Sequence, residues 1–188
     1  LLDLPTDRPR PALESHRGAR ESVMLPHGLG KSLTAISREQ GVTLFMTLLA
    51  AFEVILYRYT GAEDIVVGTP IANRTHPDTE PLIGFFVNTL ALHIDLAGNP
   101  TFAELLSRVR DVAQNAYAHQ DVPFEKVVEA VRPERNLSHT PLFQVMFALQ
   151  NTPAATFDLP GLTVTPLPIE PGTAKFDQSV SLEPAGDG

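Results

Sequence analysis

The stretch TLFMTLLAAFEVILYRYTGAEDIVVGTPIA, residues 43–72, decides the fold because it joins two apolar segments with different periodicities. Its first part, Thr43–Tyr57, carries apolar residues around nearly the whole circumference of a helix, which predicts a helix deep in the structure that ends at Gly61. Asp64–Ala72 is a compact apolar run with β-branched residues between turn formers, which predicts a buried strand. The helical part contains Glu53 and is shorter than the ~20 residues that cross a bilayer, so we interpret it as a core helix.

Further helices and strands are predicted on both sides of this stretch by the same periodicities. The clearest is a helix over Phe102–Tyr117, which begins with a capping box of Thr101 and Glu104. A short helix is expected from Phe124, with Asp121 as the candidate for its N-cap. The other predictions are a helix around Leu29–Ile36, loops over Asn73–Pro81 and Pro153–Pro160, and strands over Glu21–Leu25, Val87–Leu96, Phe143–Leu149, Leu162–Leu167 and Phe176–Leu182. Helices and strands mixed along the chain predict an α/β fold.

Length and charge exclude several classes of protein. The 188 residues fit one globular domain, and the formal net charge of −8 with no basic block argues against binding to nucleic acid or to an anionic membrane. The chain has no cysteine, which excludes disulfides, thiolate metal sites and a cysteine nucleophile, and fits a reducing compartment. Leu1–Pro11 is rich in proline and arginine and lacks the apolar core of an export signal.

No catalytic motif follows from residue spacing. Gly28–Ser32 looks like part of a phosphate-binding loop, but Leu25 stands where that motif needs a glycine, so a helix start is the favoured interpretation. The six histidines include no adjacent pair and no metal-ligand spacing. His119 and Asp121 could be a base and its orienting carboxylate, but hydrogen bonding at a helix end is favoured. The residues alone therefore predict a soluble α/β domain without a catalytic set of its own.

Three segments carry blocks whose order and spacing are typical of one enzyme family. Ile83–Leu90 is IGFFVNTL, His119–Glu125 is HQDVPFE, and Arg135–Phe147 is RNLSHTPLFQVMF. They resemble the GxFVNT, HQDxPFE and RDxSRNPLFQVMF blocks of the condensation domain of nonribosomal peptide synthetases. Shorter likenesses to the same family, in the same order, lie at residues 2–11, 66–71 and 175–177.

This resemblance implies an α/β fold in the form of a chloramphenicol-acetyltransferase-like lobe, a mixed β-sheet with helices packed on it. Condensation domains are made of two such lobes with a substrate tunnel between them, and their catalytic HHxxxDG motif lies in the first lobe. The present chain has no His-His pair. We therefore expect residues 1–20 to be the lead between the lobes and residues 21–188 to be part of the C-terminal lobe, without the first lobe, the extreme C-terminus or a catalytic residue.

The resemblance also implies a function in secondary metabolite biosynthesis. Such a domain is an acyltransferase that forms peptide (amide) bonds between a donor and an aminoacyl acceptor, each held on the phosphopantetheine arm of a carrier protein. No cofactor is expected to bind directly. The expected partners are the first lobe, upstream and downstream peptidyl carrier proteins and an adenylation domain, all cytoplasmic, and we expect the chain to be inactive alone. The alternative is a non-catalytic docking module that recruits partner enzymes; an epimerising or heterocyclising relative is disfavoured by Val87-Asn-Thr89.

Site residues are carried over from the matching blocks. Asn88 and Ser179 are the candidates for tunnel-facing groups; the alternative for Asn88 is that its amide fixes a turn at the start of a strand. Asp177 is expected to pair with Lys175 or to be solvated, and His93 stands where the family usually has arginine. The remaining motif residues, expected to be mostly structural, are Gly84, Val87, Thr89, His119, Gln120, Asp121, Pro123, Phe124, Arg135, Ser138, Pro141, Gln144, Phe176 and Asp177.

Overall fold

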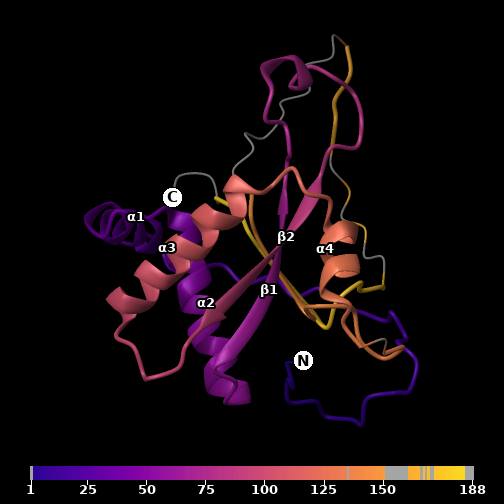
Figure 1. The fold of residues 1–188 in the computed structure, drawn as a ribbon. Helices are drawn as coiled ribbons and strands as arrows, with labels where there is room; N and C mark the ends of the chain where they lie inside the picture. Colours follow the sequence, from indigo (N-terminus) through magenta and orange to yellow (C-terminus); the bar gives the residue numbers. More distant parts are fainter. Residues whose placement is uncertain are drawn as a thin grey trace.

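A mixed four-stranded sheet forms the centre of the protein (Figure 1). The computed structural model describes residues 2–134, 136–150, 161–165, 167, 169 and 172–184. The strand order is β2-β1-β3-β4. Strand β1 (Asp64–Ile71) pairs antiparallel with β2 (Asn88–Asp95) and parallel with β3 (Val145–Leu149), which in turn pairs parallel with β4 (Gln178–Leu182). The antiparallel pair is joined by the long connection that carries part of the site described below.

Helices lie on both faces of this sheet. Helices α1 (Leu29–Glu39), α2 (Leu44–Thr60) and α3 (Phe102–Ala118) lie on one side in Figure 1, and α4 (Phe124–Val131) lies on the other. A short 3-10 helix, Pro77–Thr79, interrupts the connection between β1 and β2. No single helix in the described ranges is long and apolar enough to cross a membrane; α1 and α2 reach that length and composition only as a pair bent by 102°.

The main core lies between the sheet and α2 and α3. Residues of β1 and β2 that face these helices, such as Val67 and Leu92, are completely buried against apolar side chains of the helices. The ring of Phe52 on α2 stacks on that of Phe147 on β3, with centroids 5.2 Å apart. The nearly all-round apolar pattern of the second helix thus places it in the centre of the core, because burial of apolar surface is the main stabilising term.

A smaller aromatic cluster covers the other face of the sheet. Gly68 follows Val67 in β1 and therefore faces the opposite side, where a Cβ atom would lie 2.2 Å from the ring of Phe143. The ring of Phe143 contacts Phe124 at the start of α4 and Phe176 before β4, at centroid distances of 5.4 and 5.6 Å. This cluster fixes α4 against the sheet.

The lead, residues 2–20, has no helix or strand, and it lies against the segments at 137–144 and 172–174. The amide of Glu14 donates to the carbonyl of Leu137 at 3.0 Å, and the amide of Ala174 donates to the carbonyl of His16 at 2.8 Å. The amide of Leu2 donates to the side-chain oxygen of the buried Gln144 at 2.9 Å. The lead is therefore held along the length of these later segments.

Most of the predicted elements are confirmed, and three predictions are wrong. Residues 21–25 are irregular and exposed, since no strand in the described ranges lies beside them to complete a ladder. The described residues of 162–167 are also irregular. Pro123, not Asp121, occupies the N-cap position of α4 and gives it no side-chain cap. Arg135 and the loop at 153–160 lie outside the described residues.

Candidate functional site

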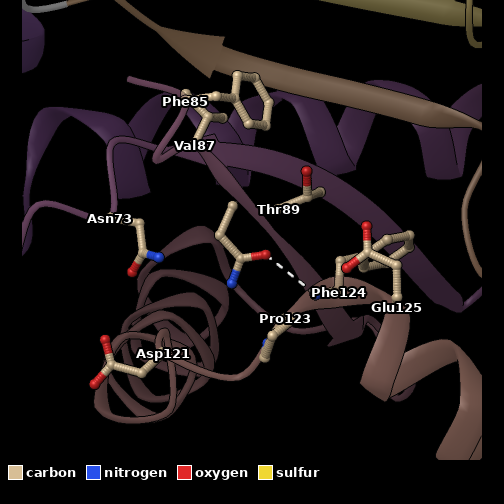
Figure 2. Close-up of a pocket in the computed structure, with 9 residues that line it drawn as sticks. Asn73, Phe85, Val87, Thr89, Asp121, Pro123, Phe124 and Glu125 are labelled. Carbon is tan, nitrogen blue, oxygen red and sulfur yellow. Dashed lines mark hydrogen bonds between the residues drawn. The ribbon is translucent and has the colours of Figure 1, made fainter. Parts of the chain in front are cut away.

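An open hollow of about 330 Å³ lies where β2 and α4 begin (Figure 2). It brings together residues from two of the family blocks, together with the loop that follows β1. The residues that line it are Asn73, Phe85, Val87, Asn88, Thr89, Asp121, Pro123, Phe124 and Glu125. The structure thus gathers six of the predicted site residues, Val87, Asn88, Thr89, Asp121, Pro123 and Phe124, around one hollow.

The amide of Asn88 connects the two elements. Its Nδ2 donates to the carbonyls of Gln120 and Val122, each at 2.8 Å, and its Oδ1 accepts the amide hydrogen of Phe124 at 3.1 Å, the dashed line in Figure 2. Both donor hydrogens and one acceptor position are therefore occupied by backbone groups. These contacts agree with the alternative in which Asn88 fixes the chain where the strand begins; a tunnel-facing role for Asn88 stays a prediction.

The HQDVPFE block forms the turn that Asn88 holds. His119 is the C-cap of α3, and its Nδ1 lies 2.8 Å from the carbonyl of Asn115. That contact is the helix-end hydrogen bonding favoured for His119. Asp121 then lines the hollow, and Pro123 precedes the short helix as its N-cap residue, with φ −59°.

The hollow presents hydrogen-bond acceptors beside an apolar wall. Asp121 and Glu125 contribute carboxylates, Thr89 contributes a hydroxyl, and Phe85 and Val87 form the apolar side. None of the nine lining residues is cationic, and none is a cysteine, serine or histidine. This set can receive a polar or amine-bearing group, but it contains no nucleophile paired with a base.

Two further motif residues, Gln144 and Asp177, contact the lead. Gln144 is buried and accepts from the amide of Leu2, while its own Nε2 donates to the carbonyl of Thr140 at 3.2 Å. The carboxylate of Asp177 accepts hydrogen bonds from the guanidinium of Arg10, which the lead places beside it. Asp177 therefore does not form the pair with Lys175, one of the two alternatives expected from the sequence.

Ser138, Pro141 and Ser179 are not among the residues that line the hollow. The hydroxyl of Ser138 donates to the side chain of Asn136 at 2.8 Å, and the carbonyl of Pro141 accepts from the amide of Phe143 at 2.9 Å. Ser179 is exposed on β4, at the edge of the sheet. Its tunnel-facing role stays a prediction. His93 is also exposed, with Nε2 3.1 Å from a carboxylate oxygen of Asp64.

Sequence reasoning missed Arg74, which organises the loop beside the hollow. Its Nη1 donates to the carbonyls of Thr79 and Glu80, and its guanidinium lies 4.2 Å from the ring centroid of Phe86. The loop held in this way exposes Ile83 and Phe85, at 104% and 91% of their reference areas. Nothing in the local sequence signals this role, because every partner of Arg74 is set by how the loop folds back.

A buried carboxyl group lies apart from the hollow, on the core side of α2. Glu53 is fully buried, and neither of its carboxyl oxygens has a hydrogen-bond partner in the described ranges. Burial raises the pKa of Glu53 well above its ordinary value, because the charged form is poorly solvated there. We assign it no chemical role in the site.

The structure has an α/β fold with a mixed sheet, and comparisons with known proteins identify the family. The family model for the condensation domain matches residues 1–188, and the chain belongs to that family. It is 53% identical over 190 residues to one component of the linear gramicidin synthase of Brevibacillus parabrevis and 54% identical over 182 residues to malpinin synthetase of Mortierella alpina. These alignments cover 100% and 97% of the chain but only 4% and 2% of the two relatives.

Solved structures agree with this assignment. The X-domain from teicoplanin biosynthesis is 32% identical with a TM-score of 0.84, covering 97% of this chain and 41% of that one. The four-domain nonribosomal peptide synthetase AB3403 is 29% identical with a TM-score of 0.78, covering 82% of this chain and 12% of that one. The expected family and the chloramphenicol-acetyltransferase-like fold are therefore confirmed.

Proposed function

We propose that this chain is part of a condensation domain that forms amide bonds between a donor and an aminoacyl acceptor, both held on phosphopantetheine arms of carrier proteins. The match of the condensation domain model to residues 1–188 carries this proposal. Holding two reactants in line can lower the activation free energy by up to ~7–11 kcal/mol. A tunnel wall can therefore contribute to the rate without a catalytic side chain of its own.

We further propose that residues 21–188 form one tunnel wall, that residues 1–20 are the lead between lobes, and that a first lobe supplies the HHxxxDG motif. Two observations support this. The chain has no His-His pair, and Ile83 and Phe85 expose apolar side chains on a loop held in place by Arg74. Exposed apolar patches mark interaction surfaces. On this proposal the carrier proteins and the adenylation domain belong to the same cytoplasmic assembly line, and no cofactor binds to this lobe directly.

The experiment is an amide-formation assay with loaded donor and acceptor carrier proteins. We expect no turnover by the 188 residues alone and turnover when they are joined to a first lobe with an intact HHxxxDG motif. Turnover by the chain alone would contradict the proposed division of roles. Failure of the joined protein would contradict the enzymatic proposal itself.

A docking module that recruits other enzymes is the second candidate, and one observation favours it. The X-domain that this chain resembles has also been solved in a complex with OxyB. The residues encoded before Leu1 distinguish the two candidates: an intact HHxxxDG motif favours the enzyme, and a degenerate motif favours docking.

A further inference from the structure

Arg10 makes a forked contact that joins the lead to the start of β4. Its Nη1 donates to a carboxylate oxygen of Asp177 at 2.9 Å and to the carbonyl of Ser138 at 3.0 Å, and its Nη2 donates to the other oxygen of Asp177. The side chains of Arg10 and Asp177 are 28% and 16% exposed. A bidentate arginine–carboxylate pair fixes orientation as well as distance, so this contact determines where Asp177 lies.

A series of direct contacts leads from this ion pair to the hollow. The amide of Asp177 donates to the carbonyl of Gln144 at 3.0 Å, and the preceding Phe176 stacks on Phe143. Phe143 contacts Phe124, whose amide hydrogen bonds to Asn88 at the hollow. Phe143 is buried directly over Gly68, so its ring cannot shift toward the sheet without a steric clash.

We propose that Arg10 is a positioning residue for the hollow. By holding Asp177, it keeps Phe176 packed on Phe143 and so fixes Phe124 and the start of α4. The attachment of the lead thus fixes the side of the hollow that Phe124 and α4 form, more than a hundred residues later in the sequence. This inference concerns contacts within the chain and does not depend on the proposed function.

The test compares hydrogen–deuterium exchange in the unmodified chain, Arg10→Gln, Asp177→Asn and the double variant, by mass spectrometry. We expect each single variant to speed exchange several-fold in peptides that cover residues 172–182 and 120–128. We expect the double variant to add little to either single change, because both single changes break the same arginine–carboxylate pair. Arg10→Lys, which keeps the charge but not the fork, is expected to restore part of the protection.

Arg8→Gln is the matched control, because the side chain of Arg8 makes no hydrogen bond within the described part of the chain. It is expected to leave both peptides unchanged. The proposal is overturned if residues 120–128 keep their protection while residues 172–182 lose it, or if the two single variants act additively. If Arg10→Gln does not fold, Arg10→Lys replaces it. Loss of the fork must then speed exchange in both peptides, and an effect on one peptide alone overturns the proposal.

Discussion

Asn88, the first residue of β2, accepts the amide hydrogen of Phe124, the first residue of α4, at 3.1 Å across thirty-six positions of sequence. Helix α4 has no side-chain cap from its own N-cap residue, Pro123. The side chain of Asn88 therefore satisfies one of the amides at the start of α4 that have no partner within the helix, and it joins the GxFVNT and HQDxPFE blocks into one unit.

Replacing Asn88 with alanine is expected to lower the free energy of unfolding by roughly 1–3 kcal/mol, since the Gln120 and Val122 carbonyls and the Phe124 amide all lose a partner. Urea denaturation followed by circular dichroism measures this change. Asn115→Ala is the control, because that side chain is exposed on α3 and is expected to change stability by less than about 0.5 kcal/mol. Equal effects of the two substitutions would contradict the anchoring role of Asn88.

The contact of Gly68 with Phe143 predicts a large effect of one added methyl group. In Gly68→Ala the new Cβ would overlap the Phe143 ring, which is held between Phe124 and Phe176. We expect a loss of about 1–3 kcal/mol in the free energy of unfolding, typical of an overpacked core. Gly30→Ala in α1 meets no atom within 4 Å and is expected to be neutral or stabilising. A tolerated Gly68→Ala would show that the aromatic cluster can move.

The buried carboxyl group of Glu53 predicts a pH dependence with a definite sign. Because its pKa is raised in the folded chain, the folded state keeps a proton that the unfolded state loses above about pH 4.3. The free energy of unfolding therefore falls as pH rises, by up to about 1.4 kcal/mol per pH unit, until the raised pKa is reached. Glu53→Gln removes this decline.

Thermal or urea denaturation at pH 5 and pH 8 checks this prediction. The gain in stability from Glu53→Gln is expected to be larger at pH 8. Glu39→Gln, at an exposed position near the end of α1, is the control and is expected to change stability little at either pH. If the stability gained by Glu53→Gln does not grow with pH, the raised pKa of Glu53 in the folded chain is contradicted.

The exposed apolar side chains of Ile83 and Phe85 predict a variant with less apolar surface but unchanged stability. Ile83 and Phe85 are almost completely exposed, so replacing both with serine is expected to alter the free energy of unfolding by less than about 0.5 kcal/mol. The same double variant is expected to bind less of a fluorescent hydrophobic dye than the unmodified chain. Unchanged dye binding would contradict the prediction that Ile83 and Phe85 form an apolar surface open to the dye.

Local sequence determined the elements whose stabilising contacts are close in the chain. The helix over Thr43–Tyr57 follows from its apolar periodicity. The capping box of Thr101 and Glu104 forms as predicted, because its two partners are three residues apart. It also lowers the pKa of Glu104, chiefly through the backbone hydrogen bond from Thr101. The family blocks marked the motif residues, but neither the blocks nor their spacing predicted that six of them would lie around one hollow.

Tertiary structure decided what those residues contact. Arg10 meets Asp177 across 167 positions, and Asn88, not Asp121, satisfies the start of α4. Residues 21–25 have the composition of a strand, but a strand also needs a neighbour with unpaired backbone groups. Hydrogen bonds and ion pairs between distant residues depend on how the chain crosses itself, whereas helix periodicity and capping depend on contacts within one turn. The sequence therefore specified the elements, and the folded chain specified their partners.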